Sequence, residues 1–295
     1  MKFDIPFSDR LASSIERKES RLVVGIDPRL DRLPAELAAL DPEDALTRLG
    51  CGVIEAVAAE AAAIKPQIAF FERWGWKGWR ALEAVCKSAS EQELLVILDA
   101  KRGDIGSTAA AYAEALLGEE AGTPGPFVDA LTINPYLGSD SLEPFIQRTN
   151  EGGRGLFVLA RTSNPGGAEF QSRPGDPEPV FLQVARASEK WGQGSMGDCG
   201  FHGVGLVVGA THPEEISRVR ECAPSANLLI PGVGAQGGSV EDLGPAFDAR
   251  GLGAVVNSSR GVVQAFEKNT ELPWQEAVQK AARETRLQLE SALTA

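Results

Sequence analysis

Residues 94–108 read LLVILDAKRGDIGST, an apolar run that passes directly into charged residues and then into a stretch suited to a helix. The apolar part is continuous and does not alternate with polar residues, which is typical of a parallel strand buried on both faces. Parallel neighbours need a crossover connection, usually a helix, between one strand and the next. The segment therefore predicts a strand–helix unit with Asp99, Lys101 and Asp104 at the carboxyl end of its strand.

The rest of the chain repeats this unit. Eight short apolar runs are expected to be strands, at 21–27, 63–71, 94–100, 128–135, 155–161, 203–210, 227–234 and 253–259. Amphipathic stretches between them are expected to be helices, at 43–62, 76–90, 107–121, 178–191, 213–222 and 239–248. Eight such repeats predict an α/β fold, the closed (β/α)8 or TIM barrel. An open, doubly wound sheet is the alternative, but its first turn usually carries a glycine fingerprint, whereas the first run here ends in GIDPR at 25–29.

The chain is expected to form a single domain over residues 1–295. Its length suits one enlarged barrel of the usual ~250 residues, and no Pro/Gly-rich linker divides it. A helical segment at about 8–20 is expected before the first strand and a helix at about 273–293 after the last. A long irregular stretch, 164–179, follows the fifth run and would lie on the catalytic rim of a barrel.

The charge balance of the chain limits its partners. With 29 Lys+Arg against 41 Asp+Glu the net charge is −12, which argues against nucleic acid or an anionic membrane as a partner. No apolar run approaches the ~20 residues of a membrane span, and the amino terminus lacks the apolar stretch of a signal peptide, so we expect a cytoplasmic protein. Four cysteines and two histidines show no metal-binding spacing, so no metal site is predicted. A small anionic substrate is still compatible, because it needs only a few local cations.

Charged residues occur in three consecutive runs of the predicted barrel or directly after them. Asp27 ends the first, Lys65 lies in the second, and Asp99 and Lys101 end the third. Residues two apart on a strand share a face, so Asp99 and Lys101 should point the same way. Such charges are costly to desolvate unless they pair, and an alternating array would hold a lysine protonated, ready to act as a general acid. The structural alternative is a solvated salt bridge, with Asp104 capping the next helix.

Two glycine-containing loops follow the last two runs. They read PGVGAQGG at 231–238 and NSSRG at 257–261. Loops after strands seven and eight of a barrel, with backbone N–H groups at a helix start, commonly hold phosphate. Arg260 adds a guanidinium that can bind phosphate through two hydrogen bonds. These loops are therefore a candidate phosphate site.

Together these segments resemble a known family. DAKRGDI at 99–105 has the DxKxxDI signature of the orotidine 5′-phosphate decarboxylases. The segments GIDPR, KPQIAFFE, TINPYLG, RTSNPGG, PGVGAQGG and NSSRG occur in that family's order. Over residues 20–265 the chain is most similar to the family's longer bacterial branch, type 2.

The resemblance implies decarboxylation of orotidine 5′-phosphate to uridine 5′-phosphate, the last step of de novo pyrimidine synthesis, without metal or cofactor. The electron pair left on C6 lies in the ring plane and cannot delocalise, so fixed charge must stabilise it. Lys101 would stabilise this carbanion and then protonate C6. Asp99 would lie against the departing carboxylate and add ground-state repulsion. Asp27 and Lys65 would hold the ribose hydroxyls and complete the charge network.

The resemblance also implies a site shared between two subunits. Asp104, Ile105 and Thr108 would come from the partner in an obligate homodimer. The remaining substrate contacts would be made by Ser163 at the pyrimidine edge and, at the phosphate, by Gln236, Gly237, Ser259 and Arg260. The glycine-rich loop would close over the substrate, although it has no obvious tyrosine to reach the phosphate.

Two other functions remain open at this point. Mg²⁺-dependent sugar-phosphate decarboxylases and aldolases of the same barrel superfamily carry a DxKxxD-like strand end and hold a metal with acidic residues. Here Ile105 follows Asp104, and Lys65 stands where a metal site would want a carboxylate. A non-catalytic nucleotide-phosphate binding protein is the other, and it would bind uridine monophosphate without turnover.

Overall fold

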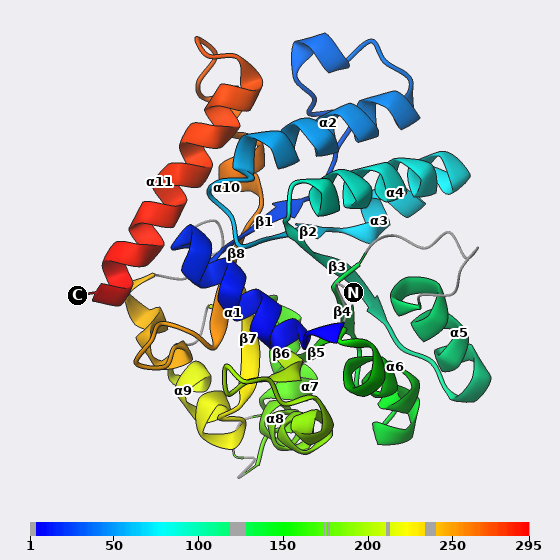
Figure 1. Ribbon diagram of the computed structural model, residues 1–295, viewed down its shortest axis with the longest axis vertical. Helices are drawn as coiled ribbons and strands as arrows, with labels where there is room; N and C mark the ends of the chain where they lie inside the picture. Colours follow the sequence, from blue (N-terminus) through cyan, green and yellow to red (C-terminus); the bar gives the residue numbers. More distant parts are fainter. Residues whose placement is uncertain are drawn as a thin grey trace.

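The computed structural model of the protein describes residues 4–118, 128–173, 175, 178–210, 213–233 and 240–294. Parallel strands pair in chain order and close into a barrel, with β8 hydrogen-bonded to β1 (Figure 1). The strands are β1 (Leu22–Ile26), β2 (Ala63–Pro66), β3 (Leu95–Arg102), β4 (Ala130–Ile133), β5 (Gly155–Arg161), β6 (His202–Val208), β7 (Ala226–Pro231) and β8 (Ala254–Ser258). Each lies within or beside a predicted run, so the (β/α)8 barrel is confirmed and the open sheet is not adopted.

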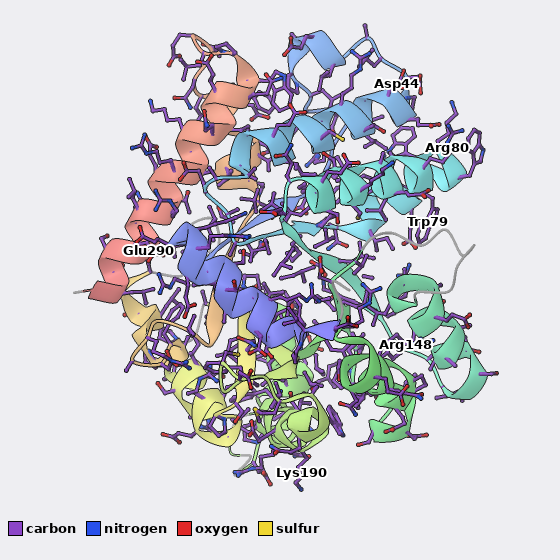
Figure 2. All side chains as sticks on the ribbon, in the orientation of Figure 1. Asp44, Trp79, Arg80, Arg148, Lys190 and Glu290 are labelled. Carbon is purple, nitrogen blue, oxygen red and sulfur yellow. The ribbon has the colours of Figure 1, made fainter. Side chains whose placement is uncertain are left out.

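Helices surround the barrel. The longer ones outside it are α2 (Pro42–Val57), α4 (Gly75–Glu91), α5 (Gly106–Leu117), α6 (Ser139–Gly152), α8 (Val180–Trp191), α9 (Pro213–Cys222) and α11 (Trp274–Thr294). α2 begins as its sequence suggests, because the Asp41 side chain accepts a hydrogen bond from the Glu43 backbone N at 3.0 Å and Pro42 needs no such partner. Charged residues on these helices, such as Asp44, Arg80 and Lys190, lie at the periphery (Figure 2). In the described part of the chain no helix is long and apolar enough to cross a membrane.

The second predicted strand was too long. Only Ala63–Pro66 is extended, and Ile68–Glu72 forms helix α3. The Gln67 side chain accepts a hydrogen bond from the Ala69 backbone N at 3.5 Å, which starts the helix. Ile68 and Phe71, three residues apart, are both buried. A short apolar run does not by itself separate strand from buried helix, and here the helical spacing decided the outcome.

Three other segments differ from expectation. Helix α6 was not predicted; it contains Pro144, and Leu142, Phe145 and Ile146 bury one face of it. The segment 239–248 contains a 3-10 helix, η5 (Glu241–Ala246), and not an α-helix; residue 239 lies outside the described residues. The described part of 164–179 is not irregular throughout, since it forms η3 (Pro165–Gly167) and α7 (Ala168–Gln171).

Helix α1 (Phe7–Lys18) covers the amino-terminal end of the barrel (Figure 1). Phe7, Leu11 and Ile15 join one buried cluster with interior strand residues, and the Phe7 ring meets the Phe157 ring edge-on at 5.9 Å. The Ser14 hydroxyl and the Lys18 ammonium donate to carbonyls just before β2, at 2.8 and 3.0 Å. Because one end is covered in this way, the carboxyl ends of the strands are left to form a site.

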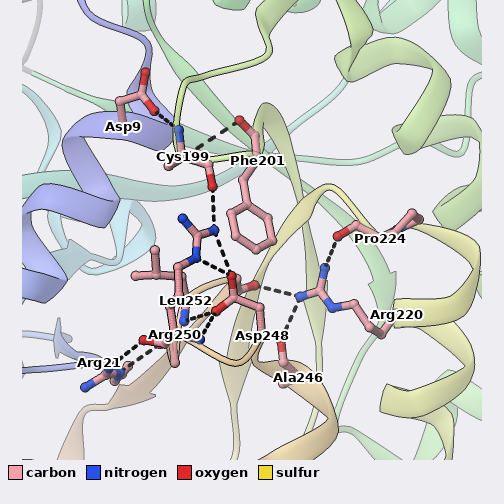
Figure 3. Close-up of polar contacts among 12 residues, drawn as sticks. Asp9, Arg21, Cys199, Phe201, Arg220, Pro224, Ala246, Asp248, Arg250 and Leu252 are labelled. Carbon is pink, nitrogen blue, oxygen red and sulfur yellow. Dashed lines mark hydrogen bonds and ion pairs between the residues drawn. The ribbon is translucent and has the colours of Figure 1, made fainter.

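A polar network ties the loops together at this amino-terminal end (Figure 3). Asp9 of α1 accepts a hydrogen bond from the Cys199 backbone N at 2.7 Å, and Arg250 donates to the Cys199 carbonyl at 2.6 Å. Asp248 in turn binds Arg250 and accepts from the Leu252 backbone N. Arg220 donates to the backbone carbonyls of Ala223, Pro224, Ala226, Ala246 and Gly253. These contacts join α1 to the segments that precede β6 and β8.

Candidate active site

Two neighbouring cavities open at the carboxyl ends of the strands. The larger, about 420 Å³, is lined by Asp27, Lys65 and Asp99 and by residues that follow β7 and β8, among them Gly232, Ser259 and Arg260. The smaller, about 230 Å³, has polar residues Lys101, Thr132, Ser163 and Asn164 over apolar Leu159, Val207 and Leu229. Lys65, Asp99 and Pro231 line both cavities. The two spaces therefore meet at the charged ends of β2 and β3.

Asp99 is the centre of a charge network at this junction. Its Oδ2 atom lies 2.6 Å from Lys65 Nζ, and its Oδ1 atom accepts hydrogen bonds from Lys101 Nζ and, at 3.0 Å, from the Thr132 hydroxyl. Lys65 and Asp99 are buried, whereas the Lys101 side chain is 45 % exposed. The structure thus brings together three of the predicted residues, with one carboxylate held between two ammonium groups. Asp27 lines the larger cavity beside them.

The ionisation of Asp99 follows from these contacts. Burial by itself would raise the pKa of this carboxyl group, but the charges of Lys65 and Lys101 and their hydrogen bonds outweigh burial and lower the pKa to about 2. Asp99 is therefore an anion throughout the neutral range. A fixed negative charge beside two ammonium groups is suited to reactions in which charge develops at a bound molecule.

Strand alternation alone does not explain why Asp99 and Lys101 meet. The backbone φ of Lys101 is +50°, in the left-handed region that non-glycine residues rarely adopt, and the pairing of β3 with β4 shifts register between Leu98 and Arg102. Asp99 and Lys101 meet as predicted, but on a strand end that is not regular. An irregular strand end holds them together.

The loops after β7 and β8 also line the larger cavity. Gly232 has φ +100°, which favours glycine, and Ser259 and Arg260 begin the short helix α10 (Arg260–Val263). β1 runs very close to this loop, since a Cβ on Gly25 would lie 1.9 Å from Ser259 Oγ. Only glycine leaves room for that hydroxyl. Gln236 and Gly237, also predicted here, lie outside the described residues.

The loop after β5 places Ser163 on the smaller cavity. On one side of it, Thr162 N donates to Gln171 Oε1 at 2.9 Å. Beneath it, Arg161 Nε lies 2.6 Å from Glu215 Oε2 in a buried ion pair. These contacts connect β5 to α7 and α9 and hold the loop against the rim.

Asp104, Ile105 and Thr108 are not brought to either cavity by the described part of this chain. They lie at the start of α5, where Asp104 Oδ1 accepts from Ile105 N at 2.8 Å. The helix-capping alternative for Asp104 is wrong, because the N-cap position belongs to Ile105 and no side chain caps the helix. Ile105 is 58 % exposed, and Tyr136 of the loop after β4 is 85 % exposed.

Thr132 is a site residue that sequence reasoning missed. It lies on β4 within the apolar run 128–135, and it is almost fully buried while lining the smaller cavity. A hydroxyl in a run that is otherwise apolar near its strand end was the available signal. A buried hydroxyl group needs hydrogen-bond partners, and those of Thr132 are Asp99 and the backbone N–H groups of Ala100 and Lys101.

Comparison with known proteins identifies the family. Residues 20–272 match the model of the orotidine 5′-phosphate decarboxylase / HUMPS family. The orotidine 5′-phosphate decarboxylase of Rhodopirellula baltica is 42 % identical over 96 % of this chain and 98 % of that protein, and that of Haloarcula marismortui is 44 % identical over 88 % of each. The solved structure of Leishmania donovani OMP decarboxylase superposes with a TM-score of 0.80 at 33 % identity, covering 99 % of this chain and 100 % of that one. The chain therefore belongs to the orotidine 5′-phosphate decarboxylase / HUMPS family.

Proposed function

We propose that this enzyme converts orotidine 5′-phosphate to uridine 5′-phosphate and CO₂ without a metal ion or organic cofactor, with Lys101 as the proton donor to C6. The observation that carries this proposal is the Asp99 carboxylate held between the Lys65 and Lys101 ammonium groups where the two cavities meet. The names of its relatives, orotidine 5′-phosphate decarboxylases, support the substrate. From its sequence motifs, we also propose that this enzyme belongs to the family's longer bacterial branch.

The two cavities suggest how the substrate lies. We place the phosphate in the larger cavity, against Ser259, Arg260 and the backbone of Gly232. The pyrimidine fits the smaller cavity, whose apolar floor would pack on the ring while Ser163 binds its polar edge. The ribose then lies beside the junction, where Lys65 and, from the larger cavity, Asp27 reach its hydroxyls. This orientation sets C6 and its carboxylate beside Asp99 and Lys101.

The chemical step follows from the charges at C6. The bond from C6 to the carboxylate breaks, CO₂ leaves, and the electron pair stays on C6 in the ring plane. The Lys101 ammonium stabilises this pair electrostatically and then transfers one proton to C6, leaving a neutral amine. Lys101 is half exposed, so solvent can return the proton after product release. Asp99 repels the substrate carboxylate before it leaves and keeps the Lys101 ammonium in place.

We further propose that the active form is a homodimer in which Asp104, Ile105 and Thr108 complete the site of the partner. The start of α5 supports this, because Asp104, Ile105 and Thr108 line neither cavity of their own chain. Around it lie large exposed apolar groups: Ile105, Tyr112, Tyr136 and Leu137. A surface of this kind is typical of an interface between proteins. We also propose that the enzyme is cytoplasmic, since its four cysteines are free thiols, as is usual in a reducing compartment.

The metal-dependent alternative is less compatible with the contacts of Asp99. Both of its oxygens accept hydrogen bonds from ammonium groups, so a cation would have to displace Lys65 or Lys101 to reach it.

We therefore expect purified protein, pre-treated with EDTA and assayed without added metal, to consume orotidine 5′-phosphate at its full rate. The loss of substrate absorbance measures this rate. Activity that disappears in EDTA and returns with Mg²⁺ would contradict the metal-free mechanism. Binding of uridine monophosphate without any turnover would instead favour the non-catalytic alternative.

Arg260→Ala should weaken the phosphate site. The loss of a charge-assisted hydrogen bond is expected to lower kcat/KM by about 10- to 100-fold, mainly through KM. The measurement is steady-state kinetics with orotidine 5′-phosphate beside Arg283→Ala, which removes an exposed arginine from α11. Orotidine without its phosphate should be turned over equally by Arg260→Ala and the unmodified enzyme. If Arg260→Ala and the unmodified enzyme had equal kcat/KM values for the phosphorylated substrate, Arg260 would not bind the phosphate.

A further inference from the structure

We propose that Thr132 is a positioning residue, whose hydroxyl holds the irregular end of β3 so that the Lys101 ammonium is fixed against Asp99. The proposal rests on the proposed function, because that function makes Lys101 the proton donor. It adds a residue of β4 to the reaction, acting through its neighbours and not on the reacting atoms.

The end of β3 contains extra residues relative to β4. Leu98 pairs with Leu131 and Arg102 with Ile133, so the residues between Leu98 and Arg102 face Thr132 alone. A bulge of this kind removes backbone groups from the regular ladder of hydrogen bonds, and those groups need other partners. Within this bulge Lys101 has its left-handed φ of +50°. Such a conformation persists only where its surroundings enforce it.

The Thr132 hydroxyl provides those partners. Thr132 Oγ1 accepts hydrogen bonds from both Ala100 N and Lys101 N, each at 3.0 Å. A hydroxyl oxygen has two acceptor positions and one hydrogen. Because both acceptor positions are used by the bulge, its hydrogen is directed to Asp99 Oδ1, 3.0 Å away. One buried hydroxyl therefore meets its full hydrogen-bonding capacity inside the charge network.

These bonds connect the backbone of Lys101 with the partner of its side chain. The Lys101 ammonium and the Thr132 hydroxyl donate to the same oxygen of Asp99, while the hydroxyl also binds the Lys101 backbone. The exposed Lys101 side chain has few other restraints, since it is 45 % accessible. Without the hydroxyl, the bulge can relax and the ammonium loses its fixed place beside C6. Displacement of the Lys101 ammonium from C6 affects the chemical step more than it affects substrate binding.

Thr132→Val tests this inference, because valine keeps the shape and removes the hydroxyl. We expect kcat for orotidine 5′-phosphate to fall by about 10- to 100-fold while KM stays within about threefold. Thr132→Ser, which restores the hydroxyl, should recover kcat to within about threefold of the unmodified enzyme. A crystal structure of Thr132→Val should show Lys101 withdrawn from Asp99, a result that does not depend on turnover.

Thr149→Val is the matched control. Thr149 is also buried and its hydroxyl donates to the Ile146 carbonyl at 2.8 Å, but it lies on α6 away from both cavities. Both valine variants should lower the melting temperature, and only Thr132→Val should lower kcat.

A folded Thr132→Val enzyme with unchanged kcat, or with Lys101 still against Asp99, overturns the inference. If Thr132→Val does not fold, Thr132→Cys, with its weak donor and acceptor, must fold and still lose kcat; if neither folds, the hydroxyl serves folding and the inference fails. Absence of turnover by the unmodified enzyme would instead refute the proposed function, while the crystallographic comparison still judges the role of Thr132.

Discussion

Lys101→Ala is expected to lower kcat for orotidine 5′-phosphate by roughly 10⁴-fold or more, because one change removes both the proton donor and the charge that stabilises the carbanion. The Asp99 anion then faces the substrate carboxylate with only Lys65 to offset it. Affinity for the phosphate should largely remain, since Ser259 and Arg260 line the larger cavity and Lys101 does not.

The measurement combines steady-state kinetics with calorimetric titration of uridine monophosphate, which reports whether the site is intact. Lys87→Ala is the matched control, because Lys87 is an exposed lysine of α4 and its loss should change neither quantity. A Lys101→Ala enzyme that binds product and turns over substrate at a near-normal rate would show that another group protonates C6.

Asp104→Ala should lower kcat by about 10²- to 10³-fold although its side chain reaches neither cavity of its own chain. The proposed homodimer accounts for this effect, because Asp104 would enter the network of the partner subunit. A role within one chain would act through the start of α5, where Asp104 Oδ1 accepts from Ile105 N.

Mixing the two inactive homodimers, Lys101→Ala and Asp104→Ala, separates these explanations. In a mixed dimer one site contains Lys101 and receives the intact Asp104 of the other subunit. Random exchange makes half of the dimers mixed with one good site in two, so about a quarter of the activity per site should return. The mixture should be followed over time, with mass spectrometry of the intact dimers to confirm exchange. Confirmed exchange without recovery of activity would rule out a composite site.

Much of the site could be predicted from local sequence. Lys65, Asp99 and Lys101 stand out because charges at the ends of apolar parallel strands are costly unless they pair, and strand ends of a barrel converge. The site role of Thr132 could not be predicted in this way, because a single hydroxyl in a buried strand is common. Its role depends on a bulge in the neighbouring strand, which no local pattern reveals.

The sequence by itself determined the barrel and the location of its charges. Eight continuous apolar runs with helices between them can bury both faces of each strand only in a parallel, helix-covered sheet, and the fingerprint of an open sheet is missing. Tertiary structure alone decided that Lys101 adopts a left-handed backbone and that Gly25 leaves room for the Ser259 hydroxyl. Each of these outcomes depends on contacts between residues far apart in the chain, whose cost or benefit appears only when the barrel closes.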